Sequence, residues 1–101
     1  MTHPLYDVTA FEIVGDYTLR ITFDDGTTQI VDLEPVLVGE MFAPLRALDF
    51  FRQVRLDPEI RTLVWPRPEG TRADFDPYVL HEWPRMVGPL TKQLRAAESA
   101  V

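Results

Sequence analysis

The stretch "YTLRITFDDGTTQIVDL", residues 17–33, decides the fold of this chain. Its first half alternates apolar and polar side chains, the pattern of a β-strand with one buried face. The apolar positions are Tyr17, Leu19, Ile21 and Phe23. The "DDG" that follows is a turn signal, and "TTQIVDL" is a second β-rich run. The stretch therefore predicts a β-hairpin with its turn near Asp25 and Gly26.

The register of this hairpin depends on the length of its loop. A two-residue loop pairs Ile21 with Ile30 across the two strands. A three-residue loop, with Gly26 in a left-handed bulge, pairs Leu19 with Val31 instead. The second arrangement is favoured because it sets more apolar pairs opposite one another.

The flanking sequence adds further strands. "VTAFEIV", Val8 to Val14, is rich in β-branched and aromatic residues and is punctuated by Gly15. Pro35 ends the third strand, and "TLVW", residues 62–65, indicates a further short strand ended by Pro66. The prediction is an α+β fold with a small antiparallel sheet: a β-β-β hairpin unit, short helices, a further short strand and a C-terminal helix.

A helical pattern lies between these strands. "MFAPLRALDFFRQV", residues 41–54, repeats apolar residues at spacings of three, at Phe42, Leu45, Leu48 and Phe51. Pro44 is acceptable only in a first helical turn, and Asp49 is a plausible N-cap. The segment is therefore either one amphipathic helix or two short ones that bury the same face.

Two Asp-Pro pairs punctuate the second half of the chain. Asp57-Pro58 predicts a turn. Asp76-Pro77 has the N-cap and first-position arrangement of a single helical turn. The expected core residues are Leu19, Ile21, Phe23, Val31, Leu45, Phe51 and Trp65, completed by Phe75, Tyr78 and Leu80.

The C-terminal segment predicts one more helix. Gly88-Pro89 is a helix start, and "LTKQLRAAESA" is rich in helix formers, so the expected helix runs from Pro89 to Ser99. Its apolar stripe includes Leu90 and Leu94, and such a short helix needs a surface to cover. That surface is its own domain, a second copy of the chain in a homodimer, or another protein. Residues 1–84 are expected to form one α+β domain and residues 85–101 a C-terminal helical extension.

Composition and charge exclude several classes of protein. A chain of 101 residues has room for one domain with one core. The net charge of −6 disfavours nucleic-acid binding, although six arginines between Arg46 and Arg72 leave a local basic face open. No apolar run approaches the roughly 20 residues of a membrane-spanning helix. Cysteine is absent and no signal peptide is recognisable, so the expected location is the cytoplasm.

No catalytic, cofactor or metal site is expected from the residue patterns. His81 and Glu82 lack a second histidine at the spacing of a zinc protease, so a half-buried or surface structural pair is the preferred interpretation. The only serine is Ser99, and there is no cysteine to act as a nucleophile. The glycines are scattered and form no phosphate-binding loop.

The order of four short motifs resembles a family of small bacterial proteins catalogued as domain of unknown function 2442. The motifs are "FDDGTTQIVDL", "MFAPLRALDFFRQV", "RTLVWP" and "ADFDPYVL", and the likeness covers residues 5–82. The resemblance implies a compact α+β domain, and no catalytic activity can be carried over from it, since none is established for the family. It also implies an accessory role, since some members are suspected antitoxin-like partners of a small protein encoded nearby. The chain departs from the pattern in "PRPEGTRA", residues 66–73, and in the segment after Glu82.

Three hypotheses of function follow from these observations. The first is a non-enzymatic protein-interaction or regulatory module, with a candidate interaction surface at Trp83, Tyr78, Leu90 and Leu94. Trp83 is either an exposed anchor of that surface or a residue folded back on its own domain. The second is a small-ligand-binding protein or an undescribed enzyme with a pocket near Trp65 and Asp74. The third is nucleic-acid binding by the face from Arg46 to Arg72.

Overall fold

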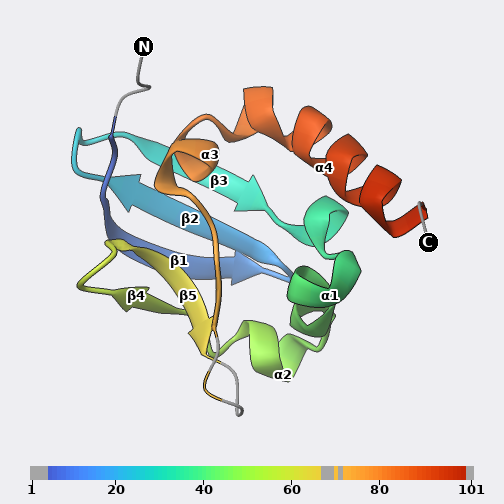
Figure 1. Cartoon of the computed structure of the whole chain (residues 1–101). Coiled ribbons are helices and arrows are strands. Elements are labelled where there is room, and N and C mark those ends of the chain that lie inside the picture. The colour runs from blue at the N-terminus through green and yellow to red at the C-terminus, as the bar shows by residue number, and fades with distance from the viewer. Residues whose placement is uncertain (1–4, 67–69, 71, 100–101) are drawn as a thin grey trace.

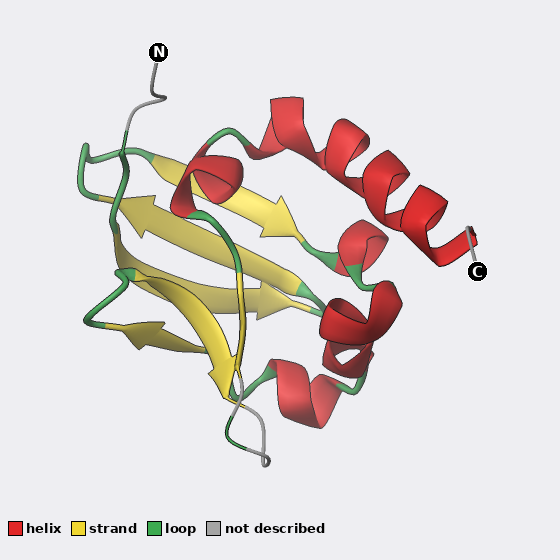
Figure 2. Ribbon diagram, viewed as in Figure 1, coloured by secondary structure: helices red, strands yellow, loops and turns green. Residues whose placement is uncertain are grey.

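The chain folds into two small antiparallel sheets with short helices between and after them (Figures 1 and 2). The computed structural model describes residues 5–66, 70 and 72–99. In the first sheet the strand order is β1-β2-β3, and in the second it is β4-β5-β6. The strands are β1 (Val8–Gly15), β2 (Thr18–Phe23), β3 (Thr28–Asp32), β4 (Arg55–Asp57), β5 (Thr62–Pro66) and β6 (Arg72–Asp74). The predicted α+β class is confirmed.

The bulged register of the β2–β3 hairpin is confirmed. Leu19 pairs with Val31, and the Phe23 N–H donates to the Thr27 carbonyl at 2.9 Å, which closes a three-residue loop. Gly26 has a φ of 84°, so a glycine here avoids the steric cost that other residues meet in the left-handed region. This register places Leu19, Ile21 and Val31 on the buried face of the sheet, whereas Ile30 lies on the outer face.

The segment between the two sheets, which includes the predicted helical residues 41–54, is divided into several single turns. The turns are η1 (Glu34–Val36), α1 (Gly39–Phe42), η2 (Ala43–Arg46) and α2 (Leu48–Phe51). Pro44 lies in the first turn of η2, as expected, but the predicted N-cap at Asp49 is wrong. Ala47 occupies the N-cap position of α2, where its methyl side chain has no group to accept a hydrogen bond, and its extended backbone, with a ψ of 111°, separates α2 from η2.

The second sheet contains one strand that the sequence predicts and two that it does not. β5 matches the predicted strand at residues 62–65, whereas β4 and β6 have only three residues each. Asp57 ends β4 and forms the predicted turn, since its Oδ1 accepts the backbone N–H groups of Glu59 and Ile60. These short strands pair with the two edges of β5 and leave its residues Thr62 to Trp65 buried.

One hydrophobic core joins the inner face of the first sheet to the short helices, β5 and α4. All seven residues of the predicted core, from Leu19 to Trp65, are at most 1% exposed, which confirms the prediction. The Trp65 ring lies 5.8 Å from the rings of both Phe51 and Phe75, and its Nε1–H donates to the Phe51 carbonyl at 2.8 Å. Trp65 therefore packs at the centre of the domain.

The C-terminal helix is longer than predicted. Helix α4 (Trp83–Ser99) begins six residues before the predicted start, and Pro89 lies inside it. Pro89 has no N–H to donate to the Arg85 carbonyl, but both residues are exposed, so water can satisfy that carbonyl. Gly88-Pro89 therefore does not begin the helix, and α4 crosses the predicted boundary between residues 84 and 85.

The apolar side of α4 covers its own domain, where the helix lies against η1 and α1 (Figure 1). Trp83 is 5% exposed, and Leu90 and Leu94 are half-buried against the core. The domain itself is thus the surface that the amphipathic pattern requires.

Replacing Leu45 with alanine should lower the free energy of unfolding by about 2–5 kcal/mol, because large-to-small changes leave a cavity in a packed core. Leu45 is fully buried in η2. Urea denaturation measures the loss. As a control, Ile30→Ala on the exposed outer face of the first sheet should cost less than about 0.5 kcal/mol. A similar small loss for Leu45→Ala would show that η2 does not pack as described.

Candidate functional site

Helix α3 (Pro77–His81) carries two of the side chains at the candidate site. Its start matches the sequence prediction, since the Asp76 Oδ1 accepts the backbone N–H of Tyr78 at 2.9 Å and Pro77 occupies the first turn. At the other end, the Gln29 side chain of β3 donates to the His81 carbonyl at 2.9 Å. These contacts fix α3 beside β3, with Tyr78 and His81 on it.

The imidazole of His81 lies between two carboxylates from distant parts of the chain. Its Nδ1 is 2.6 Å from Glu82 Oε2, and its Nε2 is 2.9 Å from Asp25 Oδ2 in the β2–β3 turn. The Thr27 hydroxyl is 3.0 Å from the same Nε2. The side chain of His81 is only 13% exposed, so these contacts link the β2–β3 turn to the junction of α3 and α4.

Aromatic rings enclose the same imidazole. The Tyr6 ring stacks on it, with a centroid distance of 3.6 Å and an interplanar angle of 3°. Phe23 presents its edge to it at 4.8 Å. We call His81, Asp25, Glu82, Thr27 and Tyr6 the histidine cluster.

The charges in the histidine cluster support one another. Burial alone would lower the pKa of His81, but the hydrogen bonds to Glu82 and Asp25 outweigh it and raise the pKa. Hydrogen bonds from the side chain and backbone of Thr27, together with that to His81, lower the pKa of Asp25 to about 2. The hydrogen bond to His81 also lowers the pKa of Glu82. The cluster therefore favours a protonated histidine between two ionised carboxylates.

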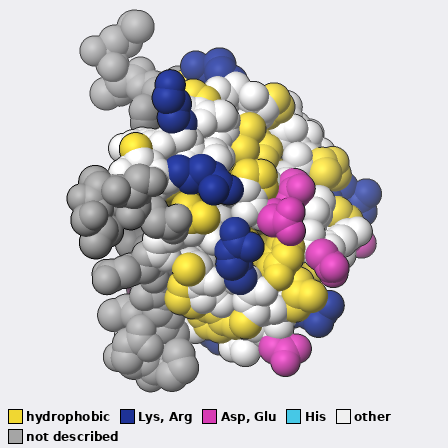
Figure 3. All heavy atoms as spheres, turned by 90° about the vertical axis from the view of Figure 1, so that its right-hand side faces the viewer, with side chains coloured by type: hydrophobic (Ala, Val, Ile, Leu, Met, Phe, Trp, Pro, Cys, Tyr) yellow, Lys and Arg dark blue, Asp and Glu magenta, His cyan; other side chains and the backbone are white. Residues whose placement is uncertain are grey.

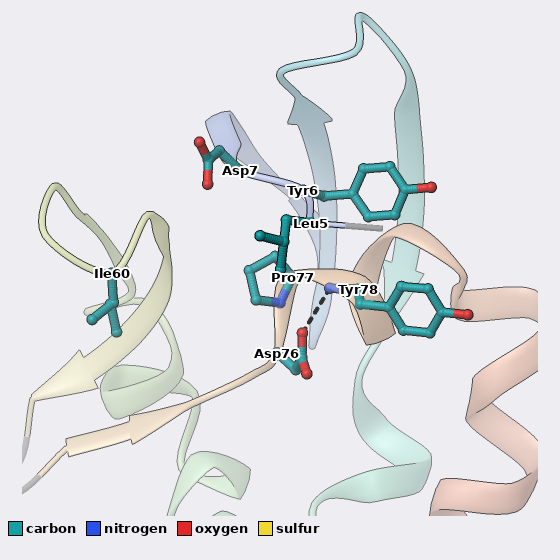
Figure 4. A pocket seen from close by; sticks show the side chains of 7 residues that line it. All are labelled: Leu5, Tyr6, Asp7, Ile60, Asp76, Pro77 and Tyr78. Atoms are coloured by element: carbon teal, nitrogen blue, oxygen red, sulfur yellow. Dashed lines mark hydrogen bonds between the residues drawn. The ribbon is translucent and has the colours of Figure 1, made fainter. Parts of the chain in front are cut away.

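A pocket of about 240 Å³ opens beside this cluster (Figure 4). The pocket is lined by Leu5, Tyr6, Asp7, Ile60, Asp76, Pro77 and Tyr78. The rings of Tyr6 and Tyr78 are nearly parallel, with their centroids 6.2 Å apart. Ile60 comes from the turn between β4 and β5, so the pocket brings three separate segments of the chain together.

The acidic side chains of the pocket are engaged within the domain. The Asp7 carboxylate pairs with Arg61 at 2.9 Å, and Asp76 caps α3. In contrast, the apolar side chains at the rim of the pocket are accessible to solvent, since Leu5 is 89% exposed and Ile60 is 37% exposed. The surface available to a ligand is thus mainly aromatic and aliphatic.

Residues 8–85 match a family described as "Protein of unknown function (DUF2442)". The chain belongs to this family. No curated protein and no solved structure matches the sequence significantly. The DUF2442 match includes the β2–β3 turn, α3 and Glu82, but not Leu5 and Tyr6 or most of α4. The cluster and the pocket therefore combine DUF2442 segments with the residues that precede them.

The four residues of the interaction surface that the sequence suggested have different environments in the structure. Among its four residues, Tyr78 lines the pocket and is half-buried rather than part of the central core. Trp83 is buried and folds back on its own domain, while Leu90 and Leu94, also in α4, pack against the core. On the neighbouring face, hydrophobic side chains are interspersed with basic and acidic ones (Figure 3).

The two other sequence-derived sites differ from their expected geometry in this DUF2442 chain. Trp65 is fully buried and fills the core, whereas Asp74 is exposed on β6. Part of the loop between them lies outside the described residues. Among the described arginines, Arg61 pairs with Asp7 and Arg72 with Asp57, so part of the local positive charge is compensated within the domain.

Sequence reasoning missed Tyr6 and the role of Asp25. Asp25 is a turn former, as its place in "DDG" indicates, but its contact with His81 spans 56 positions in the chain. No local sequence pattern predicts a contact between residues so far apart in the chain. Across the described residues, no group of three or more His, Asp or Glu side chains is placed to hold a metal ion. In the same part of the chain, no helix is long and apolar enough to span a membrane.

Proposed function

We propose that this DUF2442 chain is a non-enzymatic protein-interaction module that binds a protein partner at the pocket lined by Leu5, Ile60, Tyr6 and Tyr78. The observation that carries the proposal is the pocket's rim. Leu5 and Ile60, two large apolar residues with substantial exposure, line the pocket together with the two tyrosines. Tyrosines surrounded by apolar contacts are typical of the residues that dominate binding energy in protein interfaces.

The size of the pocket favours a protein partner over a small-molecule substrate. Pockets for drug-sized ligands usually measure about 300–1,000 Å³ and bury most of the ligand. This pocket, at about 240 Å³, is smaller and is open at Leu5. It has the capacity for one or two side chains of a partner, while the rest of the partner lies on the surrounding surface.

The resemblance noted for the sequence suggests where to find the partner. Accessory proteins of this family are suspected of acting, in an antitoxin-like manner, on a small protein encoded nearby. A regulatory role of that kind needs only a binding surface and no catalytic groups. The absence of cysteine suits a partner in the cytoplasm.

The test is binding to the protein encoded beside this one, measured by isothermal titration calorimetry with purified components. Tyr78→Ala should weaken the complex by about 30-fold or more, which corresponds to the ~2 kcal/mol of an interface hot spot. Ile60→Asp should also weaken it, because it places a charge at an apolar contact. Thermal melts of the free variants separate a loss of binding from a loss of folding.

Ile30→Asp is the matched control, since Ile30 is an exposed isoleucine on the outer face of the first sheet, away from the pocket. It should leave the affinity unchanged. Equal affinity for wild type, Tyr78→Ala and Ile60→Asp would rule out the pocket as the binding site. No binding to the neighbouring protein at micromolar concentrations would rule out that partner.

A further inference from the structure

The histidine cluster has a geometry that only the protonated form of His81 satisfies in full. A neutral imidazole carries one N–H and one lone pair, whereas the imidazolium donates from both nitrogens. Both nitrogens of His81 lie within 3 Å of a carboxylate oxygen, Glu82 on one side and Asp25 on the other. In the neutral form one of these carboxylates must face a lone pair instead of a proton.

We propose that the proton on His81 regulates the pocket, by holding the Tyr6 ring as one of its walls. The inference rests on the proposed function for what the pocket binds, and it names the regulation of that same site. Tyr6 is the residue that links the two features, because it stacks on His81 and also lines the pocket. The histidine itself does not line the pocket, so its effect passes through Tyr6.

Two contacts of Tyr6 respond to the charge on His81. The stacked imidazolium attracts the electron-rich face of the tyrosine ring, and this attraction disappears with the charge. The second effect is indirect, since the hydrogen bond between His81 and Asp25 holds the imidazole parallel to the Tyr6 ring. Phe23 and Tyr78 also touch Tyr6, and their contacts carry no proton dependence of this kind.

The Thr27 hydroxyl can replace Asp25 as the partner of His81 when the imidazole loses its proton. This hydroxyl now donates to Asp25 Oδ1 at 2.6 Å and lies 3.0 Å from His81 Nε2. When Nε2 loses its proton, the hydroxyl can turn and donate to it, and the direct bond between Asp25 and His81 is lost. The hydrogen bond from the Gln29 side-chain amide to the His81 carbonyl does not depend on the proton, so α3 itself stays in place.

The other charged and titratable groups around His81 fix the pH range. Glu82 is shared with Arg85 from α4, and Arg85 also donates to the Tyr78 hydroxyl. The His81 pKa is raised, so its contribution is complete below the ordinary histidine value of about 6.5 and is lost as the pH rises through the raised pKa. The lowered pKa values of Asp25 and Glu82 act in the opposite sense, because their contribution is lost only as the pH falls through them. The Tyr6 wall is therefore held below about pH 6.5, down to the lowered pKa values of the two carboxylates, and loosens as the pH rises through the raised pKa of His81.

The first experiment follows the ring signals of Tyr6 and the imidazole signals of His81 by NMR in the free protein as the pH is raised. His3, the only other histidine, is replaced by glutamine in every sample so that a single histidine titrates. We expect both sets of signals to change with one common midpoint above about 6.5. Tyr6 signals that stay constant while His81 titrates would overturn the proposal.

Three variants sharpen this experiment. His81→Phe keeps an aromatic ring beside Tyr6 but removes the ionisable group, so the Tyr6 signals should then be independent of pH. Asp25→Asn removes one carboxylate and should lower the common midpoint. Asp16→Asn, which removes an exposed carboxylate outside the cluster, should leave the midpoint unchanged. A pH-dependent Tyr6 signal in His81→Phe would assign the effect to another group.

The second experiment measures affinity for the protein encoded beside this one on both sides of that midpoint. We expect the affinity to fall about fivefold or more at the higher pH, the lower end of typical coupling between sites. The affinity of His81→Phe should vary much less. Shared titration of Tyr6 and His81 without any partner binding would contradict the proposed function alone, whereas pH-independent binding at the pocket would contradict the regulation.

Discussion

Replacing Trp65 with alanine should lower the free energy of unfolding by about 3–5 kcal/mol, one of the two largest effects expected in this domain. The indole is fully buried between the rings of Phe51 and Phe75. Its removal leaves a cavity and also leaves the Phe51 carbonyl without its 2.8 Å hydrogen bond. Both losses act in the same direction. Denaturation in urea, followed by circular dichroism, measures the sum.

Trp65→Phe separates the two contributions. A phenylalanine retains most of the apolar volume but has no N–H, so its cost should be smaller than that of alanine. This milder variant also keeps the measurement possible if the alanine variant does not fold, since small domains are stable by only about 5–15 kcal/mol. Val14→Ala at an exposed position of β1 is the control. A loss below about 1 kcal/mol for Trp65→Ala would contradict the described core.

Truncating the chain after Pro84 should cost a similar amount of stability. The deletion removes four partly buried apolar residues of α4, Met86, Val87, Leu90 and Leu94. If each contributes about 1 kcal/mol, roughly half of a fully buried side chain, the loss is about 4 kcal/mol. Helicity per residue in circular dichroism should fall as well, because α4 is the longest helix among the described residues.

Light scattering on the same two proteins tests the homodimer that the apolar stripe suggested. A mass per particle that halves on truncation would support a second copy bound through α4. Unchanged helicity and unchanged stability would instead show that this helix does not cover the core.

The sequence predicted the parts of the fold that depend on local patterns. Alternation in residues 17–23 and the turn at Gly26 were sufficient for the first sheet and its register. The cap at Asp76 was equally readable, because its hydrogen bond goes to a residue two positions away. β4 and β6 were missed, since three residues containing Arg and Asp carry no alternation and depend on pairing with β5.

The remaining errors have a common physical cause, which is tertiary contact. Gly88-Pro89 is a local signal for a helix start, but the helix begins six residues earlier. The burial of Trp83 stabilises this earlier start, and Pro89 is tolerated inside the helix because it is exposed. The candidate site follows the same logic. Tyr78 could be named from its place on α3, whereas the stacking of Tyr6 on His81 joins residues far apart in the chain.

The arrangement of the first sheet also bears on the order in which the domain folds. Strands β1, β2 and β3 follow one another directly within residues 8–32, so each pairing closes only a short loop. An emerging chain can form these hydrogen bonds before the residues that cover the inner face, such as Leu45, Trp65 and Trp83, have been synthesised. The turn at Gly26 thus determines which face of the sheet is apolar. The later segments then pack on a sheet whose strand register is already fixed.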